Sequence, residues 1–543
     1  MTDSGLKFDF SYAPGTTFEQ MVAFETAGQL WSKYISDDMT VNIHVEMTNA
    51  LPYNVVGGAL PAMTADISYA KFRDFYEADI TSSYDDQYFN SLSLKTDWGV
   101  EKFDALIDVG LGNNTRQSSS TIDMTRANAK ALGLVSQHSS ELDGYILMND
   151  LSNSSVDWRY ETYIKQGETG GSKLDFYSVA VHEIGHVLGF VSGVDAYEPV
   201  RFNNWTELGQ FYDYNWWQFD RHKQDVVDAA TPLDMFRYSQ HSLDINDSFN
   251  TIDLSVGANS YFGPGELRYQ FATGKDTSVY GDGFQASHWK EHRQAGEISY
   301  SGIMDPLIRM GGGRFATDRD MRAMDVIGYD LTSYGKSILS VFDESNHRKQ
   351  LTEDTSIMEI EAKEHIAKSM NSSPNAAADW VDWWIDNRPE YADRYVNRDR
   401  EEDVKRMIEQ SVVYEGRSIR TDSYSTRDYS YTRNGFWQSA YFSEFSWQEF
   451  REDTIDIKAE TILLINDEPA SSQLATNEST ANNHNEIIQH QAEIATVAMD
   501  LLTLTDAEDV IETVSTDLET ELLTQSSLYV EQLAESDLVM SLG

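Results

Sequence analysis

The chain of 543 residues has no cysteine, which excludes a disulfide framework and any metal site built from thiolates. Long apolar runs are missing as well. No stretch approaches the length of a membrane-spanning helix, so we expect no membrane span. The segment from Met1 to Phe10 lacks the apolar core of a signal peptide, so no such signal is visible.

Positive charge is also scarce. The chain has 41 Lys and Arg against 89 Asp and Glu, a net charge of −48, and neither Lys nor Arg occurs after Lys458. Such an acidic chain repels phosphate backbones and anionic lipids, so nucleic acid and membrane surfaces are not expected as partners. It suits saline surroundings or the binding of cations. Calcium is compatible with so many carboxylates, although the chain contains no EF-hand motif to support it.

The pattern of apolar residues predicts a mixture of helices and strands. Apolar residues make up 40% of the chain and aromatic residues 12%, enough for a large core and several domains. Helical spacing indicates an amphipathic helix over 17–35. Alternation of apolar and polar residues indicates a half-buried strand over 41–47, with His44 on its solvated face. Short apolar runs predict further strands at 102–110 and 144–149, so the fold class is α+β.

Three blocks are predicted along the chain. Residues 1–335 form one domain, with a long aromatic insertion at 195–285. Residues 336–465 combine helical stretches with Tyr- and Trp-rich ones. Three tryptophans of the helical part are predicted to form a buried stripe, namely Trp380, Trp383 and Trp384. Residues 466–543 are predicted as a polar linker and an acidic helical tail, so the C-terminal region is mostly helical and acidic.

One motif carries recognisable chemistry. The sequence His182-Glu183-Ile184-Gly185-His186-Val187-Leu188-Gly189 has the form H-E-x-x-H-x-x-G and lies within an apolar run. Histidines four residues apart share one face of a helix, so both imidazoles can reach one zinc ion. The glutamate between them is placed to take a proton from water. We predict a helix from Asp175, as N-cap, to Leu188, with Gly189 ending it.

A catalytic zinc site needs a third protein ligand and one open position. Three residues after Gly189, where a histidine would commonly complete the motif, the chain has Ser192, which is a poor zinc ligand. The remaining candidates for the third ligand are Asp195, Glu207 and His288.

The surroundings of His288 carry a resemblance to a known group of enzymes. The residue stands in the sequence Ser287-His288-Trp289, and Ile303-Met304-Asp305-Pro306 follows downstream. With the zinc-binding motif, these residues make 5–335 resemble the metzincin zinc peptidases, and within them the leishmanolysin-like branch. The chain differs from leishmanolysin in having no cysteine and a long insertion before His288.

The resemblance implies a catalytic domain with a twisted mixed sheet, a zinc helix, a methionine turn beneath the ligands and a closing helix. Residues 317–329 match the closing helix, with Asp318 as its cap. The resemblance implies one catalytic Zn²⁺. The site residues that it implies are the ligands His182, His186 and His288, the general base Glu183, and the structural residues Gly189 and Met304.

We therefore predict a zinc metalloendopeptidase that hydrolyses peptide bonds in proteins or peptides and acts outside the cell or at its surface. The substrate would add as a strand along residues 144–149, taken as the edge of the sheet. One alternative is a catalytically inactive zinc-containing binding or adhesion protein. Another is a zinc peptidase in which Glu207 is the third ligand. The sequence predicts no particular oligomeric state.

Overall fold

The computed structural model describes only part of the chain. With short gaps inside some ranges, it describes residues 5–49, 51, 55–108, 115–161, 173–196, 224–263, 269–311, 315–340, 344–387, 400–407 and 460–464. All of these residues belong to one compact unit, Met1–Ile465. The predicted acidic tail and most of the predicted Tyr- and Trp-rich stretches lie outside the described residues, and the predicted domain boundary at residue 335 stays a prediction.

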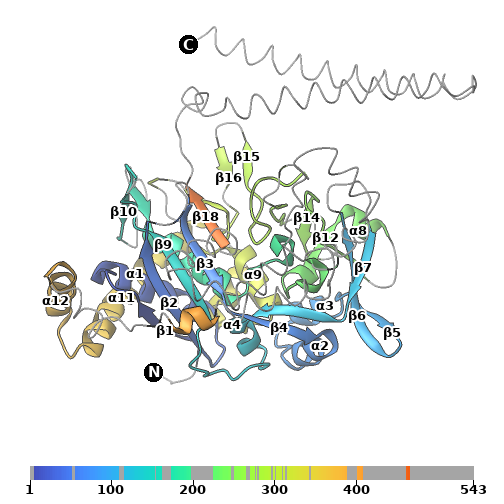
Figure 1. Ribbon diagram of the computed structural model, residues 1–543, viewed down its shortest axis with the longest axis horizontal. Helices are drawn as coiled ribbons and strands as arrows, with labels where there is room; N and C mark the ends of the chain where they lie inside the picture. Colours follow the sequence, from blue (N-terminus) through green and yellow to red (C-terminus); the bar gives the residue numbers. More distant parts are fainter. Residues whose placement is uncertain are drawn as a thin grey trace, which may run out of the picture. The chain divides into compact units, whose positions relative to one another are not determined.

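A six-stranded mixed sheet forms the centre of this unit, with the strand order β1-β2-β9-β3-β18-β17 (Figure 1). β1, β2 and β9 are parallel, β3 is antiparallel to β9, and β18 is antiparallel to β3 and parallel to β17. The strands are Lys7–Tyr12 (β1), Thr40–Thr48 (β2), Gly144–Asn149 (β9), Val55–Pro61 (β3), Glu460–Leu464 (β18) and Leu307–Ile308 (β17). The fold is therefore mixed α+β, as predicted.

The prediction that residues 144–149 form the edge of the sheet is wrong. β9 pairs along its whole length with β2 on one side, and most of it pairs with β3 on the other. All six residues of β9 are buried. An edge strand would leave one row of backbone groups unpaired, whereas both rows of β9 are engaged.

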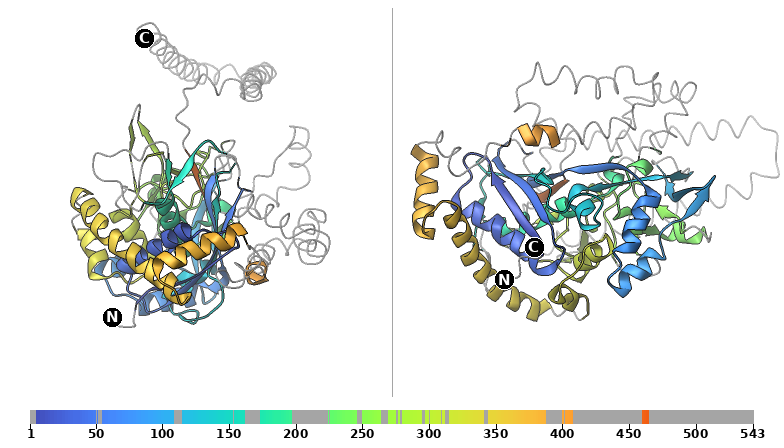
Figure 2. Two further views of the ribbon diagram at one scale, coloured as in Figure 1. Left: turned by 90° about the vertical axis from the view of Figure 1, so that its left-hand side faces the viewer. Right: turned by 90° about the horizontal axis from the view of Figure 1, so that it is seen from below.

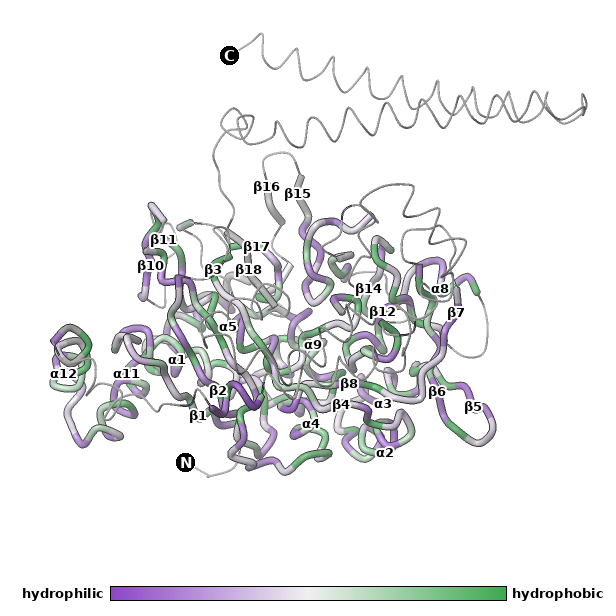
Figure 3. The backbone as a smooth tube through the Cα atoms, viewed as in Figure 1, coloured by the Kyte–Doolittle hydropathy of each residue, from purple (hydrophilic) through white to green (hydrophobic). Residues whose placement is uncertain are grey.

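Two helices, α1 (Phe18–Tyr34) and α5 (Phe176–Leu188), pack on each other and on strands of the sheet. A capping box at Thr17 starts α1, and Ile35 ends it, which confirms the predicted helix. The indole nitrogen of Trp31 on α1 donates a hydrogen bond to the carbonyl oxygen of Val181 on α5 at 3.0 Å. Figure 3 shows α5 in the interior of the described unit.

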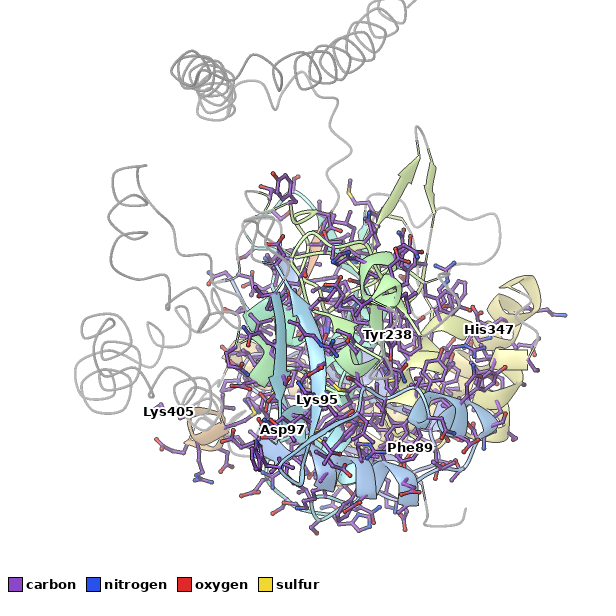
Figure 4. All side chains as sticks on the ribbon, turned by 90° about the vertical axis from the view of Figure 1, so that its right-hand side faces the viewer. Phe89, Lys95, Asp97, Tyr238, His347 and Lys405 are labelled. Carbon is purple, nitrogen blue, oxygen red and sulfur yellow. The ribbon has the colours of Figure 1, made fainter. Side chains whose placement is uncertain are left out.

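Smaller sheets and short helices surround this core. β6 (Val100–Ile107) pairs with β5 (Lys95–Asp97), β7 (Thr115–Ser119) and β13 (Ile252–Asp253), so part of the predicted insertion is built into the unit. The two-stranded sheets are β4 (Met63–Ser68) with β8 (Thr121–Thr125), β10 (Asp157–Arg159) with β11 (Lys173–Asp175), β12 (Arg237–Ser239) with β14 (Ser260–Phe262), and β15 (His292–Gln294) with β16 (Glu297–Ser299). Tyr238 of β12 lies within this packing, and its hydroxyl donates to the carbonyl oxygen of Ser91 at 2.9 Å (Figure 4).

The remaining helices lie around these sheets. They are α2 (Tyr69–Ala78), α3 (Ser83–Phe89), α4 (Arg126–Ala131), α8 (Gln240–Asp244), α9 (Asp318–Val326), α10 (Ser333–Ser340), α11 (Glu344–Ser369) and α12 (Pro374–Asn387). α11 packs against α1, and α12 follows it (Figure 2). No helix within the described ranges combines the length and the apolar character that crossing a bilayer requires.

Two sequence predictions about these helices need correction. α9 is the predicted closing helix, but Thr317 is its N-cap and Asp318 is its first helical residue. In α12 two members of the predicted tryptophan stripe are not buried, because Trp380 is 55% exposed and Trp383 is 51% exposed, and the side chain of Trp384 lies outside the description. Among the described side chains of that helix, the buried ones are the smaller Ala377 and Val381.

Candidate metal centre

α5 carries the H-E-x-x-H motif and is buried along its whole length. Asp175 is its N-cap residue and Gly189 follows its last turn with a φ of 122°, so both predicted ends are confirmed. Burial raises the pKa of the Asp175 carboxyl, the guanidinium of Arg159, 3.2 Å away, offsets part of that rise, and the resulting pKa is about 6. The helix therefore presents its polar side chains to protein groups rather than to bulk water.

His182 and His186 of α5 meet His288, which comes from a loop far along the chain, and all three side chains are fully buried. The Nε2 atom of His182 lies 3.0 Å from Nε2 of His186 and 3.2 Å from Nε2 of His288. Zinc–nitrogen bonds of about 2.0–2.1 Å in tetrahedral geometry would separate the nitrogens by about 3.3 Å. The spacing thus fits an ion such as Zn²⁺, and this triad is the one such metal-binding group within the described ranges.

The other ring nitrogen of each histidine fixes the tautomer. Nδ1 lies beside a backbone carbonyl oxygen in all three: Ile303 for His182 at 2.6 Å, Phe190 for His186 at 2.7 Å, and Gln285 for His288 at 3.2 Å. A carbonyl oxygen only accepts hydrogen bonds, so Nδ1 carries the proton and Nε2 presents its lone pair to the common point. Burial also lowers the pKa of His186 to about 4, which keeps its imidazole neutral. The donor set is therefore suited to a metal ion.

The loop that delivers His288 is held by Asp195. The carboxylate of Asp195 accepts hydrogen bonds from the backbone nitrogens of Ala286 at 2.7 Å and Ser287 at 2.8 Å, and from the Ser287 hydroxyl at 2.6 Å. Ser287 Oγ in turn accepts from the backbone nitrogen of Ser192 at 3.0 Å. Asp195 and Ser192 lie just beyond the end of α5, so these bonds connect the third histidine to the helix that carries the other two.

A second buried network lies behind this loop and is centred on Asp234. Its carboxylate accepts from the hydroxyl of Ser192 at 2.6 Å and from the backbone nitrogen of Gly193 at 2.7 Å, and it lies 3.4 Å from the guanidinium of Arg237. Arg237 donates to the carbonyl oxygen of Ala286 at 2.6 Å. Ala286 is thus held from both sides, by Asp195 at its nitrogen and by Arg237 at its oxygen.

Met304 lies against α5. A Cβ added to Gly185 would come within 2.5 Å of the Met304 sulfur, so the helix and this methionine are in close contact at the turn between the two histidines. Asp320 of α9 holds this turn, because its carboxylate accepts from the backbone nitrogen of Ile303 at 2.9 Å and from the indole of Trp289 at 2.8 Å. One buried carboxylate therefore fixes both the turn below the triad and the residue after His288.

Glu183 faces β3. A Cβ added to Gly57 would come within 2.6 Å of Glu183 Oε1 and 2.7 Å of a methyl carbon of Val179, so glycine is needed for this close approach. Glu183 is fully buried and stands on the helix between the two histidines. The structure thus places a buried carboxylate on the helix that carries two of the three histidines and beside a strand of the central sheet.

The other residues considered as the third ligand lie in different surroundings. The carboxylate of Asp195 accepts hydrogen bonds from the loop that carries His288. Asp195 therefore positions the third histidine and is not itself a ligand. Glu207 lies outside the described residues. Ser192, dismissed as a ligand, takes part in both supporting networks. Asp234, Arg237 and Asp320 were missed by the sequence reasoning, because a lone carboxylate or guanidinium in a long insertion or in a helix has no local signature.

Comparison with protein-family models, with curated proteins and with solved structures finds no match to this chain. The metal centre is therefore defined by its own geometry: three buried histidines able to hold a metal ion such as Zn²⁺, with a buried glutamate beside them on the same helix.

Proposed function

We propose that this protein is a zinc metalloendopeptidase of the metzincin type that hydrolyses peptide bonds in proteins or peptides. The observation that carries the proposal is the convergence of His182, His186 and His288 through their Nε2 atoms, with Glu183 on the same helix. Met304 against α5 and the helix α9 add support, because the resemblance implies a methionine and a closing helix at these places.

The chemistry divides between the metal and the chain. Zn²⁺ held by the three histidines would supply a Lewis acid that activates water and polarises the scissile carbonyl. Glu183 takes a proton from the attacking water and then delivers it to the leaving amine. The Nδ1–carbonyl hydrogen bonds hold the three rings in orientation, so little reorganisation is needed when the reaction starts.

The position of Glu183 also indicates where a substrate would lie. Its carboxylate packs against Gly57 of β3, so a peptide extended beside β3 would bring its carbonyl groups near both the glutamate and the metal. Main-chain hydrogen bonds to a strand bind many sequences alike, which suits a peptidase acting on protein chains. We extend the proposal to action outside the cell or at its surface on the resemblance alone. Fractionation that finds the native protein only in the cytoplasm would remove this extension.

Replacing Glu183 with glutamine tests the catalytic part. Glu183→Gln keeps the size of the side chain but removes the base, so we expect casein hydrolysis to fall by about 100-fold or more while bound zinc stays near one ion per chain. Glu25→Gln is the matched control, because Glu25 is a half-buried glutamate of α1 that accepts a hydrogen bond from the Tyr12 hydroxyl. Full activity in Glu183→Gln, measured alongside elemental analysis for zinc, would contradict the assigned role.

The third ligand is tested separately. His288→Ala should lose the zinc, whereas His292→Ala, four residues on in β15, should keep it. Zinc retained by His288→Ala and lost on substitution of Glu207 would favour the alternative peptidase with a glutamate ligand. A zinc-loaded protein that hydrolyses neither casein nor gelatin would favour the inactive binding protein.

A further inference from the structure

The metal centre alone does not account for the position of β18. This strand comes from residues 460–464, yet it pairs with both β3 and β17, and Figure 1 shows it next to β3. It also contacts α5, the helix that carries Glu183 and two of the three histidines. β3 contains the glycine against which Glu183 packs, and β17 begins three residues after Met304. β18 therefore runs through the position where the proposed function expects a peptide.

The residue pairing of β18 shows which part of the strand would overlap a bound peptide. Ile462 of β18 is paired with Gly57 of β3, and Leu463 is paired with Leu307 of β17. The middle of β18 thus stands beside the residue of β3 that touches Glu183. β18 is antiparallel to β3 and parallel to β17, so its main chain engages a strand on each side, as an extended peptide bound in this slot would.

The main-chain pairing of β18 is short on the β17 side and irregular on the β3 side. The pairing with β17 involves two residue pairs, and the register with β3 shifts between Ile462 and Leu463. A short ladder with an irregularity is weaker than a continuous one. If β18 left, β3 and β17 would each present an unpaired edge to the slot, and such edges bind extended chains.

We propose that Glu460–Leu464 is a resident peptide of the substrate slot, which occupies the place of an extended substrate and must leave before a substrate binds. This inference rests on the proposed function and adds its self-inhibition. A segment of the same chain competes with a free peptide at an effective concentration that does not depend on the amount of protein. The protein therefore binds peptides more weakly than its open slot would, and the rate at saturating peptide is unchanged.

Proline in β18 removes a backbone donor from the ladder and tests the proposal in the full-length chain. Ile462→Pro should release the strand, and Ser472→Pro is the matched control in the polar stretch downstream. A second variant with Gly-Ser-Gly-Ser-Gly in place of Glu460–Leu464 keeps the chain length. Circular dichroism and thermal unfolding establish that each variant is folded.

The first measurement is hydrogen exchange of the β3 amides, made in the Glu183→Gln background so that proteolysis does not interfere. We expect exchange about ten-fold faster in Ile462→Pro than in the control. The second measurement is hydrolysis of a fluorogenic peptide, for which we expect a KM about ten-fold lower at unchanged kcat. The synthetic peptide Lys458–Asn466 should then inhibit Ile462→Pro competitively.

The possible results separate the two ideas. Unchanged exchange in β3 for both variants, or faster exchange with an unchanged or higher KM, would overturn the resident-peptide proposal and make β18 a permanent strand. If no form of the protein hydrolyses peptides, the proposed function fails. Fluorescence anisotropy then measures the binding of labelled Lys458–Asn466 and tests the resident-peptide proposal without any need for activity. Tighter binding of this peptide to Ile462→Pro than to Ser472→Pro supports the resident-peptide proposal, and equal binding to the two variants overturns it.

Discussion

At the scale of single residues, the triad depends on side chains that touch no metal. Asp195 accepts three hydrogen bonds from Ala286 and Ser287, and so fixes the two residues that precede His288. A carboxylate can accept from several donors at once, whereas a carboxamide has only one acceptor oxygen. The position of the third ligand is therefore sensitive to the chemistry of a residue that is not itself a ligand.

Asp195→Asn is expected to weaken zinc binding by about 10- to 100-fold, because the amide group would face the Ala286 and Ser287 donors with a donor of its own. Competition titration against a zinc chelator of known affinity measures the change. Asp244→Asn, at the end of the short helix α8, serves as the control. Wild-type zinc affinity in Asp195→Asn would show that the loop keeps its position without this carboxylate.

Gly185 provides a second test at this scale. Gly185→Ala places a methyl group 2.5 Å from the Met304 sulfur, which must move, and overpacking of this kind costs about 1–3 kcal/mol. We expect a lower unfolding midpoint in denaturant and weaker zinc binding. Met304→Ala creates space, so Gly185→Ala should do less harm in that background. Equal harm in both backgrounds would mean that the contact with Met304 is not the cause.

At the scale of elements, the ends of helices gather carboxylates. Asp79 is the C-cap of α2, where the helix dipole disfavours negative charge. Burial, followed by the nearby carboxylates of Asp37 and Asp330, raises the pKa of Asp79 from 3.8 to about 8. The pKa of Asp37 is itself raised to about 7, mainly by burial. This cluster favours protonated carboxyls in the folded state.

The stability of the folded protein depends on pH through the Asp79 carboxyl. The folded state binds the Asp79 proton more tightly than the unfolded state, so stability falls as pH rises from about 4 to about 8. Asp79→Asn should therefore be more stable than the wild type at pH 8, and the difference should vanish near pH 4. Thermal unfolding across this range measures it, with Asp74→Asn on the same helix as control. A difference that is independent of pH would contradict the assignment.

At the scale of the whole molecule, the metal centre connects distant parts of the chain. α5, the His288 loop and the turn at Met304 meet at one point, so an ion bound there stabilises all of them together. Binding to the folded state alone adds about 4.1 kcal/mol at a free concentration of about 1,000 times Kd. A zinc chelator should therefore lower the thermal midpoint, and added zinc should restore it. His288→Ala should respond to neither, and a chelator effect of equal size in that variant would place the ion elsewhere.

The parts of this arrangement that depend on residues close together in the sequence could be predicted. The H-E-x-x-H helix, its two ends and the helix over 17–35 follow from periodicity and capping residues. His288 could be chosen from three candidates only through its resemblance to a known motif. His44 shows the limit, because its alternating pattern predicted a solvated face. In fact His44 is buried, with Nδ1 3.0 Å from the Ser11 hydroxyl. β1 and β9 flank its strand on both sides, which no local pattern reveals.

The wrong edge strand has the same physical origin. Residues 144–149 were correctly predicted as a strand, but strand position in a sheet depends on partners, and two of the strands beyond β9 come from residues 307–308 and 460–464. The supporting network was unpredictable for a similar reason. Asp195 stood out as a carboxylate near the motif, but only the folded chain shows that backbone nitrogens of residues 286 and 287 surround it.

The Asp234 network has a consequence for how such a chain can diverge. Asp234 joins Ser192 and Gly193 to Arg237, so the chain leaving α5 and the chain returning after residue 224 are fastened together close to the ligands. Doubling the length of a flexible loop costs only about 0.6 kcal/mol in closure entropy. Because the chain on both sides of residues 197–223 is fixed there, a change in the length or sequence of that stretch should leave the imidazoles in place, so the metal centre can be inherited intact while this part of the sequence diverges.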